Sequence, residues 1–370
     1  ADKALGASPG NGEAFKLKAG AQMALGDLKG AEATLRTAVD KTPQSADLRR
    51  SLAEILVARR DFDGARAEIK TLFEANASDV PTMLIAARLA TAEGKTDQAL
   101  DWLKRATLAA PQNGRARVAE IGGLVAAGRK DQALAAAAAA EQALPRDPAV
   151  LRAVGGARVM AGRPGEAVAT FNRLAQLQPD AAEPLRLLAA AEAAAGQQAA
   201  ARRTLDKAAA LPGGALAYGD IARMEPRQGN VDAALAAAEK LVAAQPQSGP
   251  GRILLGDLQG AKGRPAEALR NYEVAREADF TDEVLLRLVG AYRRVGRNAD
   301  ATATINAFAK ARPDSPTPLV ILGDIALDAG RWEQAVGHYE QLRKTRGDRD
   351  PAMLNNLAWA QFQLGRTREA

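Results

Sequence analysis

The sequence contains no cysteine and a single histidine in 370 residues, and these absences remove several kinds of chemistry. Without thiols the chain cannot form a disulfide, a thiolate metal site or a cysteine nucleophile. His338 has no second imidazole to share a metal or a proton relay with, so we expect it to be a solvent-exposed or interface residue. The Gly-containing strings at 10–12 and 249–251 lack the lysine of a phosphate loop. The sequence therefore predicts a protein that is not an enzyme and needs no cofactor or metal.

Aromatic residues are scarce, at 4%, and no apolar run reaches the length of a membrane span. Alanine and leucine dominate, and runs of β-branched residues are absent, which favours helices over strands. The formal net charge of +6 is mild for a chain of this length. It leaves room for an acidic partner but does not indicate nucleic-acid binding.

Turn residues and alanines recur along the sequence at a regular spacing, and we call these two series the comb. Between Leu151 and Pro179 the pattern is one helical stripe, a turn at Gly162, a second helical stripe and a closing proline. The turn residue recurs about every 34 residues, at Gly26, Arg60, Gly94, Gly128, Gly162, Gly196, Gly229, Gly263, Gly296, Gly330 and Gly365. An alanine follows five residues after each turn, at Ala31, Ala65, Ala99, Ala133, Ala167, Ala201, Ala234, Ala268, Ala301, Ala335 and Ala370. Such a period predicts stacked helix-turn-helix units without one central core.

We therefore expect one continuous array over residues 1–370. Residues 12–350 form ten repeats in this prediction, with boundaries 12–45, 46–79, 80–113, 114–147, 148–181, 182–214, 215–248, 249–281, 282–315 and 316–350. Residues 351–370 look like the start of an eleventh repeat. Residues 1–11 look like the tail of a preceding one, because Ala4 and Pro9 fall at its last small residue and its closing proline. The first residue is Ala1 rather than Met, so we expect a window from a longer array.

The stretch 211–229 departs from the comb. The repeat 182–214 closes early with Leu211-Pro212-Gly213-Gly214, and Pro226 lies late in the first helix of the next repeat. Proline removes a helical hydrogen bond, so we expect that helix to kink or end there. A local change of pitch and a functional hinge both remain open as interpretations.

The repeat resembles the tetratricopeptide repeat, a helix-turn-helix unit of this period. The features that match are the alanine after the turn, the closing proline and a small residue in the first helix. These small residues are Ala19, Ala53, Ala87, Gly155, Ala189, Ala222, Gly256, Gly323 and Ala358. The resemblance implies an all-α solenoid, coiled as a right-handed superhelix. It also implies a partner-binding scaffold but identifies no partner.

In such a solenoid the first helices line a concave groove. Positions 2, 5, 9, 12 and 13 of each repeat lie off the packed stripe and should face that groove. Arginine recurs at these positions, at Arg88, Arg115, Arg152, Arg186, Arg223, Arg227, Arg293 and Arg294. Through repeats 3–7 only Glu183 opposes them, whereas repeats 8 and 10 present Asp257, Asp324 and Asp328.

Arginine binds carboxylates bidentately and stacks on flat surfaces. We therefore predict a protein or peptide partner with acidic character, or an anionic polysaccharide. The alternative is that these arginines form only a solvated face. On the last helix, Asn355, Trp359 and Phe362 also fall on the groove side. Trp359 could stack on a sugar or anchor a peptide, or it could pack against a further repeat.

A narrower resemblance lies in the C-terminal half, in the segments Lys240–Pro246, Leu254–Asp257, Gly263–Leu269 and Leu354–Ala360. They are similar to the bacterial repeat lipoproteins of the PrsT type, which accompany exopolysaccharide and PEP-CTERM sorting systems. This resemblance implies a periplasmic or cell-envelope scaffold beside a polysaccharide exporter. Two alternatives stay open: a cytoplasmic adaptor for acidic protein termini, and the recognition arm of a larger enzyme such as a glycosyltransferase.

Overall fold

The computed structural model describes residues 11–366, and within that range the chain forms helices and turns without a strand. The expected tail of a preceding repeat lies, apart from Asn11, outside the described residues, and so does Ala370 of the alanine comb. The described chain divides into two compact units. Unit 1 ends at Thr204 and unit 2 begins at Leu205, a boundary that falls inside one helix.

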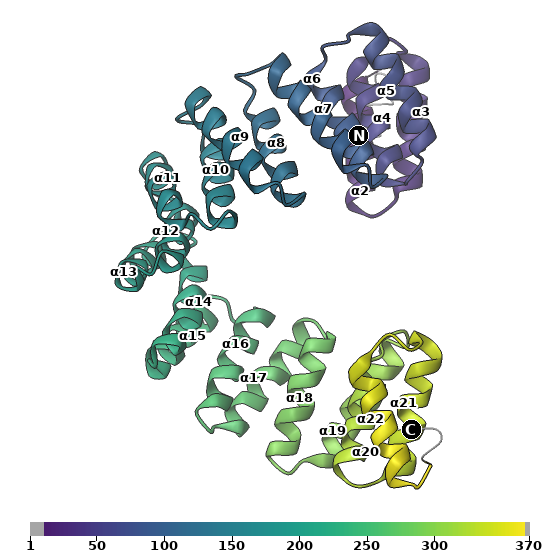
Figure 1. The fold of residues 1–370 in the computed structure, drawn as a ribbon, viewed down its shortest axis with the longest axis vertical. Coiled ribbons are helices and arrows are strands. Elements are labelled where there is room, and N and C mark those ends of the chain that lie inside the picture. The colour runs from purple at the N-terminus through teal and green to yellow at the C-terminus, as the bar shows by residue number, and fades with distance from the viewer. Residues whose placement is uncertain (1–10, 367–370) are drawn as a thin grey trace. The chain divides into compact units, whose positions relative to one another are not determined.

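Unit 1 is built from pairs of antiparallel helices. Its helices are α2 (Gly12–Ala24), α3 (Leu28–Lys41), α4 (Ala46–Ala58), α5 (Phe62–Ala75), α6 (Val80–Ala92), α7 (Thr96–Ala109), α8 (Gly114–Ala126), α9 (Lys130–Ala143), α10 (Pro148–Met160), α11 (Pro164–Leu177), α12 (Ala182–Ala194) and most of α13 (Gln198–Ala209). The first helices α2, α4, α6, α8 and α10 each contact their own second helix, and α4 also contacts α2 and α6 (Figure 1). The hairpins therefore stack in the order in which they occur in the sequence.

Unit 2 continues with the same kind of hairpin. Its helices are α14 (Ala215–Met224), the 3-10 helix η1 (Glu225–Gln228), α15 (Val231–Ala244), α16 (Gly249–Ala261), α17 (Pro265–Ala278), α18 (Asp282–Arg294), α19 (Asn298–Ala311), α20 (Thr317–Asp328), α21 (Trp332–Arg346) and α22 (Pro351–Gln363). First helices again contact one another, as α14 does α16 and α20 does α22. The buried side chains form a series of local clusters along each unit.

Short polar side chains fix where most first helices begin. Ser45, Asp79 and Asn113 each accept a hydrogen bond from the backbone N–H three residues later, which satisfies a donor that the helix leaves free. The first helices start at residues 12, 46, 80, 114, 148, 182, 215, 249, 282, 317 and 351. Each start is the first residue of a predicted repeat, except that Thr317 lies one residue after 316.

The comb of turn residues marks left-handed backbone positions. All ten predicted turn glycines have φ between 66° and 79°. Arg60, which stands in the comb where the other repeats have glycine, also adopts this conformation, with φ of 64°. Non-glycine residues pay about 1–2 kcal/mol for this region. The predicted helix-turn-helix pattern is therefore confirmed at its turns.

Gly155 shows how the two helices of a repeat fit together. A Cβ atom added at Gly155 would lie 2.4 Å from Cε1 of Phe171, so the space left by the glycine holds an aromatic ring from the second helix. Gly256 faces Tyr272 and Gly323 faces Tyr339 in the same way. Where the first-helix residue is alanine, the residue sixteen positions later is usually aliphatic, as in the pairs Ala19 and Leu35, Ala53 and Ile69, Ala87 and Leu103, and Ala189 and Leu205. Where the two helices cross, a smaller residue on the first helix is thus paired with a larger side chain on the second.

The irregular stretch around Pro226 behaves as its sequence predicts. Helix α14 ends at Met224, and the residues around Pro226 form the single 3-10 turn η1. The early closure before it depends on Gly213, with φ of 72°, and on Gly214, where an added Cβ would lie 2.1 Å from the Ala208 carbonyl oxygen. Whether this stretch acts as a hinge stays a prediction.

Candidate functional site

The predicted binding residues lie on the first helices, apart from Arg227, which follows one of them. We call the surface that they form the first-helix face. In unit 1 it carries Arg88 on α6, Arg115 on α8, Arg152 on α10 and Arg186 on α12. Arg88, Arg115 and Arg152 are exposed, and Arg186 is partly buried. Helix α8 contacts both α6 and α10, so the first three of these arginines stand on neighbouring helices.

Two of these arginines are joined to the adjacent repeat by ion pairs. Arg152 binds Glu183 through two parallel hydrogen bonds, Nε to Oε1 and Nη2 to Oε2, both 2.8 Å long. This hydrogen-bonded contact lowers the pKa of the Glu183 carboxyl group. Arg88 binds Glu54 on the preceding first helix. Glu54 belongs to repeat 2, one repeat before the stretch in which only Glu183 was expected to oppose the arginines.

Arg115 differs from its two neighbours. It is exposed, and it forms no ion pair or hydrogen bond with any residue in the range 11–366. Its guanidinium group therefore keeps all five donors for water or a partner. A carboxylate from a partner could therefore bind Arg115 without displacing a carboxylate of residues 11–366.

In unit 2 the first-helix face carries Arg223, Arg227, Arg293, Arg294, Asn355 and Trp359. All six are exposed. Arg223 pairs with Asp220 in its own helix at 2.8 Å, and Arg293 pairs with Asp328 of the next repeat at 3.2 Å. Arg227 lies in η1. Neither Arg227 nor Arg294 forms an ion pair with another described residue.

The acidic residues predicted in repeats 8 and 10 are held by hydrogen bonds. Asp257 accepts one from the Tyr272 hydroxyl at 2.8 Å and a forked pair from Arg287, with Nε–Oδ1 at 2.8 Å and Nη2–Oδ2 at 2.9 Å. Asp324 accepts one from the Tyr339 hydroxyl at 2.5 Å. Burial, together with the nearby carboxylate, raises the pKa of both tyrosines. These aspartates are therefore less available to a partner than their sequence positions suggest.

Arg294 borders a pocket of about 340 Å³ between α16, α17 and α18. Leu286, Arg287, Asp257 and Tyr272 are among its other lining residues. Sequence reasoning predicted Asp257 and Arg294 for the groove but missed Arg287 and Tyr272. A signal was present: a Gly-Asp pair precedes a tyrosine by fifteen residues both at Asp257 and at Asp324.

Asn355, Trp359 and Phe362 form one exposed stripe along α22. The rings of Trp359 and Phe362 are stacked, with centroids 5.9 Å apart. The side chains of Trp359 and Phe362 are 50% and 55% exposed. The structure thus brings together the aromatic residues that the sequence placed on this side of the helix, with Asn355 one turn away.

Groups suited to catalysis are sparse in the described part of the chain. No cluster of three His, Asp or Glu residues that could hold a metal occurs between residues 11 and 366. His338 is half-buried on α21, and burial lowers its pKa. Between α21 and α22, Asp348 pairs with Arg343, and Asp350 caps α22. Among the helices in the described range, none combines the length and apolar composition needed to cross a bilayer.

Comparison with known proteins supports the helical-repeat reading. Tetratricopeptide-repeat family profiles match residues 23–89, 123–182 and 322–370. The crystal structure of yeast Tom70 is similar over 99% of this chain and 91% of its own, with 13% identity and a TM-score of 0.51. A tetratricopeptide repeat protein from Parabacteroides merdae is similar over 75% of this chain and 97% of its own, with 16% identity and a TM-score of 0.44. No curated protein sequence matches the chain.

The matched segments and the hairpin stacking agree on the fold. The chain contains tetratricopeptide repeats, and its architecture is an all-α solenoid of such repeats. The likeness to Tom70 concerns the fold alone. Repeat arrays of this kind serve as surfaces for protein partners.

Proposed function

We propose that the chain is a non-enzymatic scaffold that binds an acidic segment of a protein partner on the first-helix face of unit 1. The observation that carries the proposal is Arg115, exposed and without an internal partner, on the helix between those of Arg88 and Arg152. Three arginines on adjacent parallel helices present forked donors at the spacing of the repeats. An extended chain with several carboxylates could bind more than one of them.

The internal ion pairs of this face do not prevent such binding. Arg152 and Glu183 are 43% and 48% exposed, and Arg88 and Glu54 are 57% and 43% exposed. Exposed pairs of this kind contribute about 0–1 kcal/mol, because water screens them. A partner carboxylate can therefore replace Glu183 or Glu54 at small cost in free energy.

The test uses the full chain and a fluorescein-labelled deca-glutamate peptide, with binding followed by fluorescence anisotropy. The double variant R115E/R152E should weaken binding at least tenfold, since each change replaces a favourable contact by a repulsive one. Glu183→Gln should strengthen binding, because Arg152 loses its competing carboxylate. The matched control is R203E/R270E, the same two charge reversals at exposed arginines on the second helices α13 and α17.

Each outcome decides the proposal. Equal weakening by R203E/R270E and by R115E/R152E would show that only the overall positive charge attracts the peptide, and it would overturn the site. Binding of alginate, an acidic polysaccharide, without binding of the peptide would replace the protein partner by a polysaccharide. Selective loss in R115E/R152E together with the gain in Glu183→Gln would establish the face.

We further propose that this scaffold works in the bacterial cell envelope, in exopolysaccharide export. The support is the similarity of four C-terminal segments to the PrsT-type lipoproteins. The intact natural protein, analysed by mass spectrometry with its N-terminal peptide mapped, tests this setting. A diacylated N-terminal cysteine would support it. A methionine start that leads directly into repeats would favour a cytoplasmic adaptor, and an additional α/β domain would favour the arm of a glycosyltransferase.

A further inference from the structure

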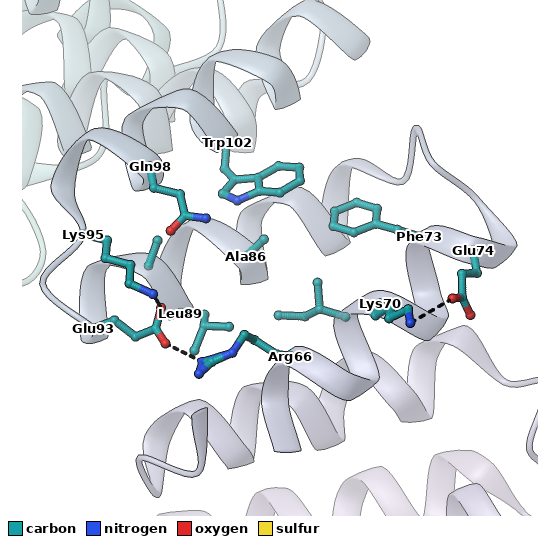
Figure 2. A pocket seen from close by; sticks show the side chains of 12 residues that line it. Arg66, Lys70, Phe73, Glu74, Ala86, Leu89, Glu93, Lys95, Gln98 and Trp102 are labelled. Carbon is teal, nitrogen blue, oxygen red and sulfur yellow. Dashed lines mark hydrogen bonds and ion pairs between the residues drawn. The ribbon is translucent and has the colours of Figure 1, made fainter. Parts of the chain in front are cut away.

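A cavity of about 600 Å³ lies in unit 1 between the second helices α5 and α7, above the first helix α6 (Figure 2). Its floor is apolar and consists of Ile69, Ala86, Leu89 and Ala90. Arg88, the residue that α6 contributes to the first-helix face, does not line it. The cavity is therefore a separate feature from the proposed binding face.

A small residue at one position of the repeat leaves room for the cavity. Ala90 is residue 11 of its repeat, and the same position holds Leu56, Leu124, Arg158 and Tyr292 in four other repeats, with a second alanine only at Ala326. Arg158 shows what normally fills the space: it reaches the second helices on both sides, with hydrogen bonds to Glu141 and Thr170. The methyl group of Ala90 is too short to reach either second helix, and the space above it stays open.

Two aromatic rings form the wall where other repeats have small or polar residues. Phe73 and Trp102 occupy the positions that Glu141 and Thr170 occupy two repeats later. Their rings are stacked, with centroids 5.0 Å apart and an interplanar angle of 10°. Arg105 also lies over the Trp102 ring, 4.9 Å from its centroid. The ring surface that these contacts leave free favours a flat ligand, since aromatic rings pack in offset parallel or edge-to-face arrangements.

The three cations and two carboxylates at the rim all have partners of opposite sign, and Asp63 beside the rim supplies the third carboxylate, 2.9 Å from Arg66. Glu93 binds Arg66 at 2.6 Å and Lys95 at 3.0 Å, and Lys70 lies 3.8 Å from Glu74 (Figure 2). Glu93 is only 10% exposed, so a charged ligand would have to compete with ion pairs that water screens less there, whereas an uncharged ligand would not. The rim therefore favours a ligand without net charge.

One polar donor remains unused at the wall. The indole N–H of Trp102 donates to no residue of the described chain. Figure 2 shows the indole nitrogen on the edge of the ring that points toward Gln98 and Ala86. A hydrogen-bond acceptor on the ligand would satisfy this donor, and the exposed amide of Gln98 offers a second polar contact.

We propose that this cavity is a binding site for a small, planar, uncharged ring compound that carries a hydrogen-bond acceptor. Its volume lies within the range of about 300–1,000 Å³ typical of small-molecule sites, and an apolar lining with a few polar groups is typical of them too. A single aromatic side chain of a protein partner would fill much less of it. The proposed ligand site and the proposed partner-binding face are separate, because none of the arginines proposed to bind the partner lines the cavity.

The test uses prodan, an uncharged naphthalene with a ketone oxygen, whose emission shifts to the blue in an apolar site. Wild-type chain should bind it saturably, with a Kd of about 0.2 mM or tighter. Ala90→Leu should weaken binding at least tenfold, because the leucine fills the cavity as Leu56 and Leu124 do in their own repeats. Ala92→Leu is the matched control, with the same change at an exposed position of α6 outside the lining, and it should bind as wild type.

Trp102 supplies a second readout. With Trp332 and Trp359 changed to phenylalanine, emission of the remaining Trp102 should be quenched by prodan. Trp102→Phe should weaken prodan binding several-fold but leave binding of N,N-dimethyl-2-naphthylamine, which lacks the ketone, nearly unchanged. R115E/R152E should bind prodan normally, so failure of the proposed function would be recognised separately.

Three results would overturn the assignment. Wild-type chain could show no saturable binding, or Ala90→Leu and Ala92→Leu could bind prodan equally. The anionic dye 8-anilinonaphthalene-1-sulfonate could bind tighter than prodan, with a strong salt dependence, which would mean that the rim selects charge. Circular dichroism of each variant establishes that the loss does not come from unfolding.

Discussion

Replacing Gly155 by alanine should reveal how the helices of one repeat fit together. The added methyl group would lie 2.4, 2.5 and 2.9 Å from three carbons of the Phe171 ring, whereas carbon atoms normally approach to about 3.5 Å. The ring is only 3% exposed, so it has little room to move. Overpacking of this degree costs about 1–3 kcal/mol.

The neighbouring Gly156 provides the control. It lies in the same helix, and a Cβ added there meets no atom within 4 Å. Alanine forms helix better than glycine by about 1 kcal/mol, and this gain applies to both substitutions. We therefore expect Gly156→Ala to stabilise the repeat by up to about 1 kcal/mol, and Gly155→Ala to leave it about 1–3 kcal/mol less stable than Gly156→Ala.

The second control restores the fit by changing the partner. Three other repeats combine alanine at the position of Gly155 with leucine at the position of Phe171, as Ala87 and Leu103 do. The double variant G155A/F171L should therefore be more stable than the sum of its two single changes predicts. A favourable coupling energy of about 1 kcal/mol or more is expected for side chains in direct contact.

Hydrogen exchange measured by mass spectrometry on peptides from α10 and α11 is the assay of choice. Repeat arrays can unfold in parts, so a local measurement is safer than one global transition. Urea unfolding followed by circular dichroism gives an independent comparison of wild type, Gly155→Ala, Gly156→Ala, Phe171→Leu and the double variant. Equal stability of Gly155→Ala and Gly156→Ala, or strict additivity in the double variant, would refute the volume-pairing argument.

Three further predictions concern single positions. Burial and Asp257 raise the pKa of Tyr272, so its contribution to stability is complete below about pH 10, the value of an unfolded tyrosine, and is lost as the pH rises through the folded value. Tyr272→Phe should therefore flatten the loss of stability above pH 10, as followed by urea unfolding; an unchanged slope would contradict the shift. Gly214→Ala should destabilise unit 2 by about 2 kcal/mol or more, because the methyl group meets a backbone carbonyl, whereas Gly290→Ala, with nothing within 4 Å, should not. Arg60→Gly should stabilise its repeat by about 0.5–1 kcal/mol, because glycine adopts the left-handed conformation of residue 60 at a lower cost than arginine. A lower melting temperature in this variant would speak against that reasoning.

The sequence predicted the helix-turn-helix pattern well because its signals are local. A left-handed turn residue, a capping serine or aspartate and an interrupting proline each act on the few residues around them. This is why the turns at Arg60 and Gly162 and the end of α14 before Pro226 follow the predicted pattern. The same periodic positions also placed the arginines of the first-helix face on exposed sides of their helices, except for Arg186, which is partly buried.

The pairing of these side chains could not be predicted in the same way. Arg88 meets Glu54, and Arg287 meets Asp257, across distances of 34 and 30 residues. Which acid an arginine reaches depends on the offset between neighbouring helices and on the rotamers of both residues. Assigning residues to a helix face predicted their exposure. It did not distinguish Arg115, which has no partner among residues 11–366, from Arg152, which has one.

By itself, therefore, the sequence determined the class of fold, the turns, and which side of each helix faces the solvent, since these depend on a backbone period and on neighbouring residues. Only the tertiary structure decided which charges are already paired, which glycines make room for a ring, and that Ala90, Phe73 and Trp102 enclose a cavity. These features depend on side chains from different helices that meet in space. Such contacts follow from the packing of several helices at once and leave no period in the sequence.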